Sequence, residues 1–202
     1  MVGEGEPKIL HGGNFYGGHI GFVMDSLKNL IANMADLLDR QMAVLVDPKF
    51  NNGLPANLSG VEGPRACINH GLKALQIGAS AWTAEALKNT MPASVFSRST
   101  ESHNQDKVSM GTIAARDALR VLELTEQVAA AHMIATLQAI RLREREGVLS
   151  SHNYTPALRR YLDDLSTQVE FLCEDRPLDS LLRALISKIQ ARAWPLYGDN
   201  TQ

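Results

Sequence analysis

The side chains best suited to chemistry gather in one short segment, residues 99–106. It holds Glu101, His103, Asn104 and Gln105, so a carboxylate, an imidazole and two carboxamides stand close together. A long helix is predicted to begin near Asn104, and the exposed N–H groups and positive dipole of a helix start favour an anionic ligand. We therefore predict a ligand site here. Ser102 and Gln105 also have the spacing of a capping box, which makes a plain helix start an equally good interpretation.

A second candidate segment lies earlier, in residues 11–18. Its four glycines allow the backbone to approach a ligand closely, and they surround Asn14, Phe15 and Tyr16. From the pattern alone, Asn14 is more typical of a turn, and Tyr16 is as well explained by a structural role. Neither segment supplies a nucleophile or an electrophile. The isolated histidines lack the spacing of metal ligands, so no metal site is predicted.

Helices must position both segments. Apolar residues at three- and four-residue spacing predict helices over residues 19–46 and 69–89, with Asp25 and Lys28 on other faces of the first. A third helix, over 104–146, would be about 60 Å long. Thr155-Pro156 and Asp175-Arg176-Pro177 are start signals for two shorter helices. We expect a glycine-rich site loop (1–18), a long-helix bundle (19–146) and a segment of short helices (147–202).

The third helix is too long to be buried inside one small globule. Its apolar residues spread over more than one face, so partner chains are expected to pack against it. Arg116 and Asp117 lie among apolar neighbours, which predicts an ion pair between helices or between subunits. Strict seven-residue seams are not evident, which disfavours a coiled-coil adaptor.

Composition excludes several classes of function. The chain has 202 residues, a formal net charge of -2 and 45% hydrophobic residues, enough for one elongated domain or two small ones. Its balanced charge argues against nucleic-acid binding. No apolar run approaches a membrane span and no signal peptide opens the chain, so no membrane role is predicted. Cys67 and Cys173 are interpreted as free thiols, which indicates a cytoplasmic protein.

An ordered set of motifs resembles a known family. The set consists of residues 11–18, Asp47-Pro48 with Gly53-Leu54-Pro55, Asn104-Gln105-Asp106, Ser109-Met110-Gly111 and Ala114-Ala115-Arg116. In order and spacing it is similar to the C-terminal half of the aromatic amino acid ammonia-lyases and aminomutases, which act on histidine, phenylalanine or tyrosine. The resemblance covers residues 11–194.

The resemblance implies a fold and a set of roles. The fold would be all-α, an up-down bundle of long antiparallel helices that assembles as a homotetramer around a common helical core. Asn14 and Phe15 would lie beside an electrophilic prosthetic group, with the Phe15 ring near the substrate and Tyr16 within reach of it. Glu101 would lie near the substrate amino group and Asn104 near its carboxylate. Gln105 would join the hydrogen bonds around the prosthetic group.

The sequence departs from the family at its reactive centre. The family's methylidene-imidazolone forms from an internal Ala-Ser-Gly tripeptide, and these 202 residues contain none; the nearest strings are Gly78-Ala79-Ser80 and Leu58-Ser59-Gly60. The family's catalytic tyrosine and carboxylate-binding arginine would precede Val2. We therefore expect no catalytic residue in this chain, a prosthetic group supplied by a missing N-terminal half, and no lyase activity from the chain alone.

Two functions stay open at this point. The first is a C-terminal fragment or subunit of a lyase or aminomutase, which would need the N-terminal half, a homo-oligomer or both. Met1 is followed at once by a mid-domain loop, which favours a truncated piece. The alternative is a non-catalytic helical oligomer that serves as a binding protein or scaffold. The residues do not distinguish elimination of ammonia from an amine shift, nor one aromatic substrate from another.

Overall fold

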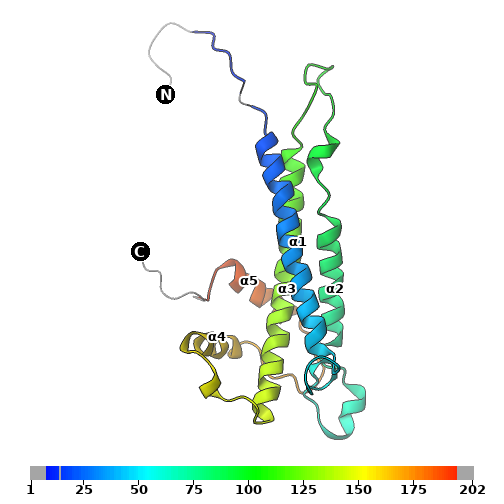
Figure 1. The fold of residues 1–202 in the computed structure, drawn as a ribbon, viewed down its shortest axis with the longest axis vertical. Helices are drawn as coiled ribbons and strands as arrows, with labels where there is room; N and C mark the ends of the chain where they lie inside the picture. Colours follow the sequence, from blue (N-terminus) through cyan, green and yellow to red (C-terminus); the bar gives the residue numbers. More distant parts are fainter. Residues whose placement is uncertain (1–7, 14, 195–202) are drawn as a thin grey trace.

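Three long helices form the body of the molecule. The computed structural model describes residues 8–13 and 15–194, and in it α1 (Gly18–Val46), α2 (Lys73–Lys88) and α3 (Gly111–Arg145) run side by side along the longest axis (Figure 1). The helices α1 and α3 start at the same end, and α2 runs antiparallel to both. The short helices α4 (Pro156–Ser166) and α5 (Asp179–Gln190) lie beside the other half of α3. Within the described ranges there is no strand, so the predicted all-α, up-down bundle is confirmed.

Short 3-10 helices occupy the connections between these elements. They are η1 (Ala56–Leu58), η2 (Gly63–Ile68), η3 (Ala93–Phe96) and η4 (Ser151–Asn153). The predicted start of α4 is confirmed, because Thr155 Oγ1 accepts a hydrogen bond from Leu158 N at 3.3 Å and Pro156 is the first helical residue. Helix α1 ends before Asp47-Pro48, as predicted.

The predicted start of the long helix is wrong. Helix α3 begins at Gly111, after Met110 in the left-handed conformation, and no side chain caps it. Upstream, Thr100 and Gln105 form an isolated antiparallel bridge around Glu101, Ser102 and His103, whose φ angles are all positive, at 56°, 53° and 70°. Three consecutive left-handed residues cannot belong to a right-handed helix. The polar segment is therefore a turn, and the capping-box interpretation is overturned.

Helix α3 is enclosed mainly by its own chain. It carries small buried residues, which allow neighbouring segments to pack closely against its backbone: Ala114, Ala118, Ala130, Ala131, Ala135 and Ala139. Larger side chains such as Leu124 and Leu142 fill the space between them and are fully buried. Ile113, Leu119 and Leu122 of α3 stay exposed, and the packing of partner chains against this helix stays a prediction.

A long row of exposed apolar side chains lies on α1. Its outward face carries a set of exposed apolar residues whose spacing alternates between three and four: Ile20, Val23, Leu27, Leu30, Met34 and Leu37, followed by Val44. We call this set the α1 seam. This is the seven-residue spacing of a helix–helix packing seam, so the statement that no such seam is evident is wrong for α1. No helix in the described part of the chain is long and apolar enough to cross a membrane.

Candidate functional site

The bundle topology brings the two predicted segments together. Because α1 and α3 start at the same end, the residues that precede them are neighbours in space (Figure 1). They line a pocket of about 380 Å³ that we call the site pocket: Phe15, Tyr16, Gly17, Asn104, Gln105, Asp106, Lys107, Val108 and Ser109. Four of the residues predicted from the sequence, Phe15, Tyr16, Asn104 and Gln105, thus share one pocket. Asn14 lies outside the described residues.

Glycines allow the two segments to meet. A Cβ atom on Gly21 would lie 3.0 Å from Ser109 O, and one on Gly17 would lie 3.2 Å from Ser109 Oγ. Both contacts are closer than a side chain tolerates easily, so the start of α1 touches the backbone before α3 directly. The glycine-rich patch is visible in the sequence, whereas the requirement for Gly21 arises only from this tertiary contact.

Glu101 acts on the site pocket through its neighbours. It is not a lining residue; its carboxylate accepts hydrogen bonds from Asn104 Nδ2 and Gln105 Nε2, both at 3.3 Å. These contacts orient two carboxamides that do line the pocket. His103 stands on the same turn, where its Nδ1 lies 2.9 Å from Ser99 Oγ, and it is exposed outside the pocket lining.

The electrostatics of the site pocket favour an anionic group. Gly17 and Met110, the residues before the first turns of α1 and α3, provide no side-chain cap, although Gly111 N donates to Ser109 Oγ at 3.3 Å. The positive ends of both helices lie at this end of the bundle. Lys107 adds a positive side chain, while Asp106 adds a carboxylate. Asp106 belongs to the family-like motif, but neither residue was predicted to line the site.

The pocket side chains are open to solvent. Phe15 is 79% exposed and Tyr16 is 47% exposed, whereas Gln105 is half-buried. An aromatic surface, two carboxamides and a pair of opposite charges suit a ligand that carries a ring, a carboxylate and an amine. In the described part of the chain, no group of three or more His, Cys, Asp or Glu side chains is arranged to hold a metal ion.

A larger hollow of about 590 Å³ lies at the opposite end of the bundle, between α2 and residues 172–182. Its lining is mainly aliphatic, with Trp82 on one side. The carboxylate of Asp175 at its edge already accepts hydrogen bonds from His70 N at 2.7 Å and Gly71 N at 2.8 Å. We therefore take the smaller, more polar pocket as the candidate site.

Comparisons with known proteins show what the chain is similar to. Residues 1–166 match the family model described as aromatic amino acid lyase. The chain is 37% identical to the tyrosine ammonia-lyase of Cereibacter sphaeroides and 32% identical to the histidine ammonia-lyase of a Geobacillus species, over 92% and 98% of its own length. It covers only 34% and 37% of those proteins, so it spans about a third of the curated relatives.

A solved structure is also similar to this chain. The crystal structure of tyrosine aminomutase from Streptomyces globisporus superposes with a TM-score of 0.80 at 30% identity, over 93% of this chain and 34% of that one.

Proposed function

The chain belongs to the aromatic amino acid lyase family, and from this premise we propose that it is the C-terminal part of an ammonia-lyase or aminomutase acting on an aromatic L-amino acid. In the first reaction the C–N bond breaks, a proton leaves the neighbouring carbon, and an arylacrylate and ammonia form. In the second, the amine moves to the neighbouring carbon. The observation that carries the proposal is the site pocket, where Phe15 and Tyr16 meet Asn104 and Gln105.

The proposed roles follow from the chemistry of each side chain. The exposed ring of Phe15 packs against the substrate ring, with Tyr16 beside it. The carboxamide of Asn104 binds the substrate carboxylate near the two helix starts. Glu101 orients Asn104 and attracts the substrate amino group, so the substrate lies with its reacting carbons between the ring and the carboxylate.

The electrophile comes from outside this chain. A methylidene-imidazolone is a planar, neutral group, and an aromatic ring at Phe15 with a carboxamide at Gln105 suits one side of it. Its chemistry is that of an electron sink for C–N cleavage. Because the Ala-Ser-Gly precursor is absent from these 202 residues, the chain alone is inactive as a lyase.

Assembly is the second part of the proposal. The α1 seam presents apolar side chains over most of one helix face, a larger apolar surface than single proteins ordinarily leave to solvent. We expect α1 to pack against other lyase chains, as a homotetramer or with the N-terminal part of the enzyme.

The experiment mixes this chain with a polypeptide that carries the preceding two-thirds of a relative, such as the Cereibacter tyrosine ammonia-lyase. Arylacrylate absorbance and ammonia are then measured with phenylalanine, tyrosine and histidine. We expect product from the mixture alone, and loss of product with Asn104→Ala. The matched amide control is Gln190→Ala on α5, whose exposed side chain bonds only to Glu126. Product from the chain alone, or a mixture indifferent to Asn104→Ala, contradicts the proposal.

A non-catalytic helical scaffold is the second candidate. It is favoured by the α1 seam together with the missing tripeptide. Size-exclusion chromatography with light scattering distinguishes the two candidates. A stable oligomer that stays inert after the N-terminal polypeptide is added supports the scaffold, and restored turnover supports the enzyme.

A further inference from the structure

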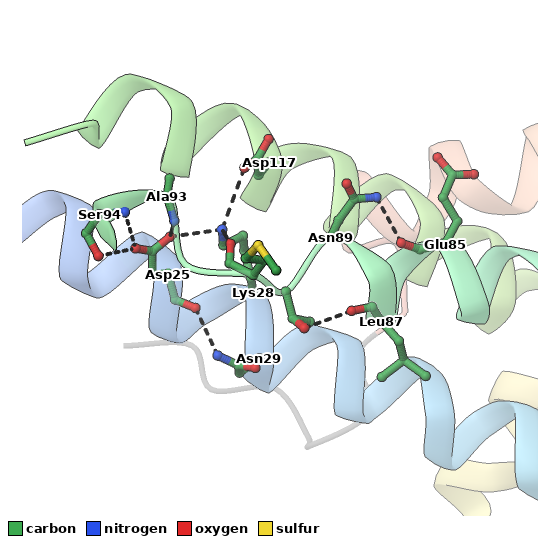
Figure 2. A network of polar contacts seen from close by, with 11 residues as sticks. Asp25, Lys28, Asn29, Glu85, Leu87, Asn89, Ala93, Ser94 and Asp117 are labelled. Carbon is green, nitrogen blue, oxygen red and sulfur yellow. Dashed lines mark hydrogen bonds and ion pairs between the residues drawn. The ribbon is translucent and has the colours of Figure 1, made fainter. Parts of the chain in front are cut away.

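A buried cluster of charges joins α1 to the segment that follows α2 (Figure 2). The side chain of Lys28 is fully buried, and its Nζ donates to Met91 O at 2.7 Å. The same Nζ lies 2.9 Å from Asp25 Oδ1 and 3.6 Å from Asp117 Oδ2 on α3. The predicted inter-helix ion pair of Asp117 is thus confirmed. Asp25 and Lys28 lie off the apolar face of α1, as predicted, but their own face is the buried one and the apolar face is exposed.

The carboxylate of Asp25 binds the first residues of η3. It accepts hydrogen bonds from Ala93 N at 2.9 Å and Ser94 N at 3.1 Å, and Ser94 Oγ donates to it at 2.8 Å. Burial alone would raise the pKa of Asp25, but hydrogen bonds from Lys28, Ala93 and Ser94 lower it to about 2. Two side chains of α1 thereby fix residues 91–94, a stretch that has no long helix or strand of its own.

This stretch leads directly into the site pocket. Three residues beyond Ser94, Ser97 Oγ accepts a hydrogen bond from Val108 N at 3.0 Å and donates to Val108 O at 2.7 Å. These contacts close the base of residues 97–110, which we call the site loop and whose tip carries Glu101 and Asn104. The far arm of the loop rests on α1 as well, through the contact of Ser109 with Gly21.

Both arms of the site loop are therefore fixed to α1, the helix that Phe15 and Tyr16 precede. We propose that Asp25 and Lys28 are positioning residues, which hold the site loop at the distance from residues 15–17 that gives the site pocket its shape. Their effect on catalysis rests on the proposed function, but their effect on the loop does not. A buried ion pair is a poor source of stability compared with an apolar pair, so a positional role accounts for these charges better.

The first test measures amide hydrogen exchange of the chain itself, as wild type, Asp25→Asn and the double variant Asp25→Asn/Lys28→Met. The double variant removes both charges, so no unpaired buried charge is left to unfold the protein. In the double variant we expect exchange at Ala93 and Ser94 to accelerate about tenfold or more, with the site loop following, at a melting temperature close to that of wild type. Asp25→Asn alone leaves Lys28 charged and buried, so this variant should also melt lower.

The matched control is Glu85→Gln, which removes the exposed ion pair with Arg120 (2.7 Å) between α2 and α3 and touches neither the site loop nor η3. We expect it to leave loop exchange unchanged. Unchanged exchange across residues 97–110 in the double variant, or equal acceleration in the control, overturns the positioning proposal.

The second test uses the reconstituted mixture with the N-terminal polypeptide. We expect the double variant to lower kcat/KM about tenfold at an unchanged melting temperature, and the Glu85→Gln control to leave it unchanged. If loop exchange accelerates but the wild-type mixture makes no product, the proposed function fails and the positioning of the loop stands. If the mixture is active and equally so in the double variant, the positioning proposal fails and the proposed function stands.

Discussion

The two ends of the three-helix bundle are built in different ways. At the far end, side chains of α3 bind the backbone of the connecting segments. The buried Gln138 donates from Nε2 to Leu58 O and Leu172 O, both at 3.1 Å, and its Oε1 accepts from Leu172 N at 3.0 Å. Arg143 donates to Asn51 O at 2.9 Å. At the site end, the polar side chains of the loop tip are exposed and bond mainly to one another.

The far end therefore contributes mainly to stability, and the site end contributes mainly to ligand binding. The far end uses its polar groups to complete its own fold, so little remains there to recognise a ligand. At the site end, the cluster around Asp25 fixes the residues that lead into the site loop, while Phe15 and Asn104 stay exposed. Such a division predicts that variants at the far end change stability, and that variants at the site end change function.

The largest stability effect is expected from Gln138→Ala. The substitution leaves Leu58 O and both backbone groups of Leu172 without their buried partner and opens a cavity, which together should lower the free energy of unfolding by about 3–5 kcal/mol. Urea unfolding followed by circular dichroism measures it. A loss below about 1 kcal/mol would mean that the far end does not carry the stability assigned to it.

Glu101→Ala should show the opposite behaviour. Among the described residues its exposed carboxylate bonds only to Asn104 and Gln105, so the free energy of unfolding should stay within about 0.5 kcal/mol of wild type. In the reconstituted mixture, kcat/KM should fall about 100-fold, on the order of 2.7 kcal/mol. The control is Glu123→Ala, an exposed carboxylate 3.4 Å from Arg120 on α3, which should leave both quantities unchanged. Equal losses in the two variants would contradict the division.

The sequence predicted the helices better than the site. Thr155-Pro156 and the spacing of apolar residues are local signals, and they located α4 and α1 closely. The family motif identified Phe15, Asn104 and Gln105. It did not predict the turn that carries Glu101, because that turn depends on Asp25, Ser97 and Gly21, which lie far away in the sequence. On α1, Asp25 and Lys28 look like ordinary surface charges until α2 and α3 bury them.

Low pH should weaken the hydrogen bonds between Asp25 on α1 and residues 93–94, because it protonates the Asp25 carboxylate. The pKa of Asp25 is about 2 in the folded chain against an ordinary 3.8, so its contribution is fully present above about pH 4 and disappears as the pH falls through 2. The difference corresponds to about 2 kcal/mol. Urea unfolding at several pH values should therefore show a steeper acid loss for wild type than for Asp25→Asn. Parallel curves would show that the carboxylate is not held as described.

The smallest effects come from a matched pair of glycines, one at each end. Alanine in a helix interior is favoured over glycine by about 1 kcal/mol, so Gly21→Ala on α1 and Gly78→Ala on α2 share the same intrinsic gain. At Gly78 the new methyl group would meet the Trp82 ring at 3.4 Å, an ordinary contact, and stability should rise by about 0.5–1 kcal/mol. At Gly21 the new methyl group would lie 3.0 Å from Ser109 O. This oxygen belongs to the backbone, so the contact can lengthen only if the site loop moves.

Gly21→Ala should therefore lower stability by about 1 kcal/mol and reduce turnover in the reconstituted mixture, whereas Gly78→Ala should leave turnover unchanged. Thermal melts of the two variants give the sign directly, since the melting temperature should fall in one and rise in the other. If both variants melt at a higher temperature than wild type, the site loop can shift at Ser109 without a loss of stability. The close contact between α1 and the loop would then not be what shapes the site pocket, and the fixing of the loop would depend on Asp25 and Lys28 alone.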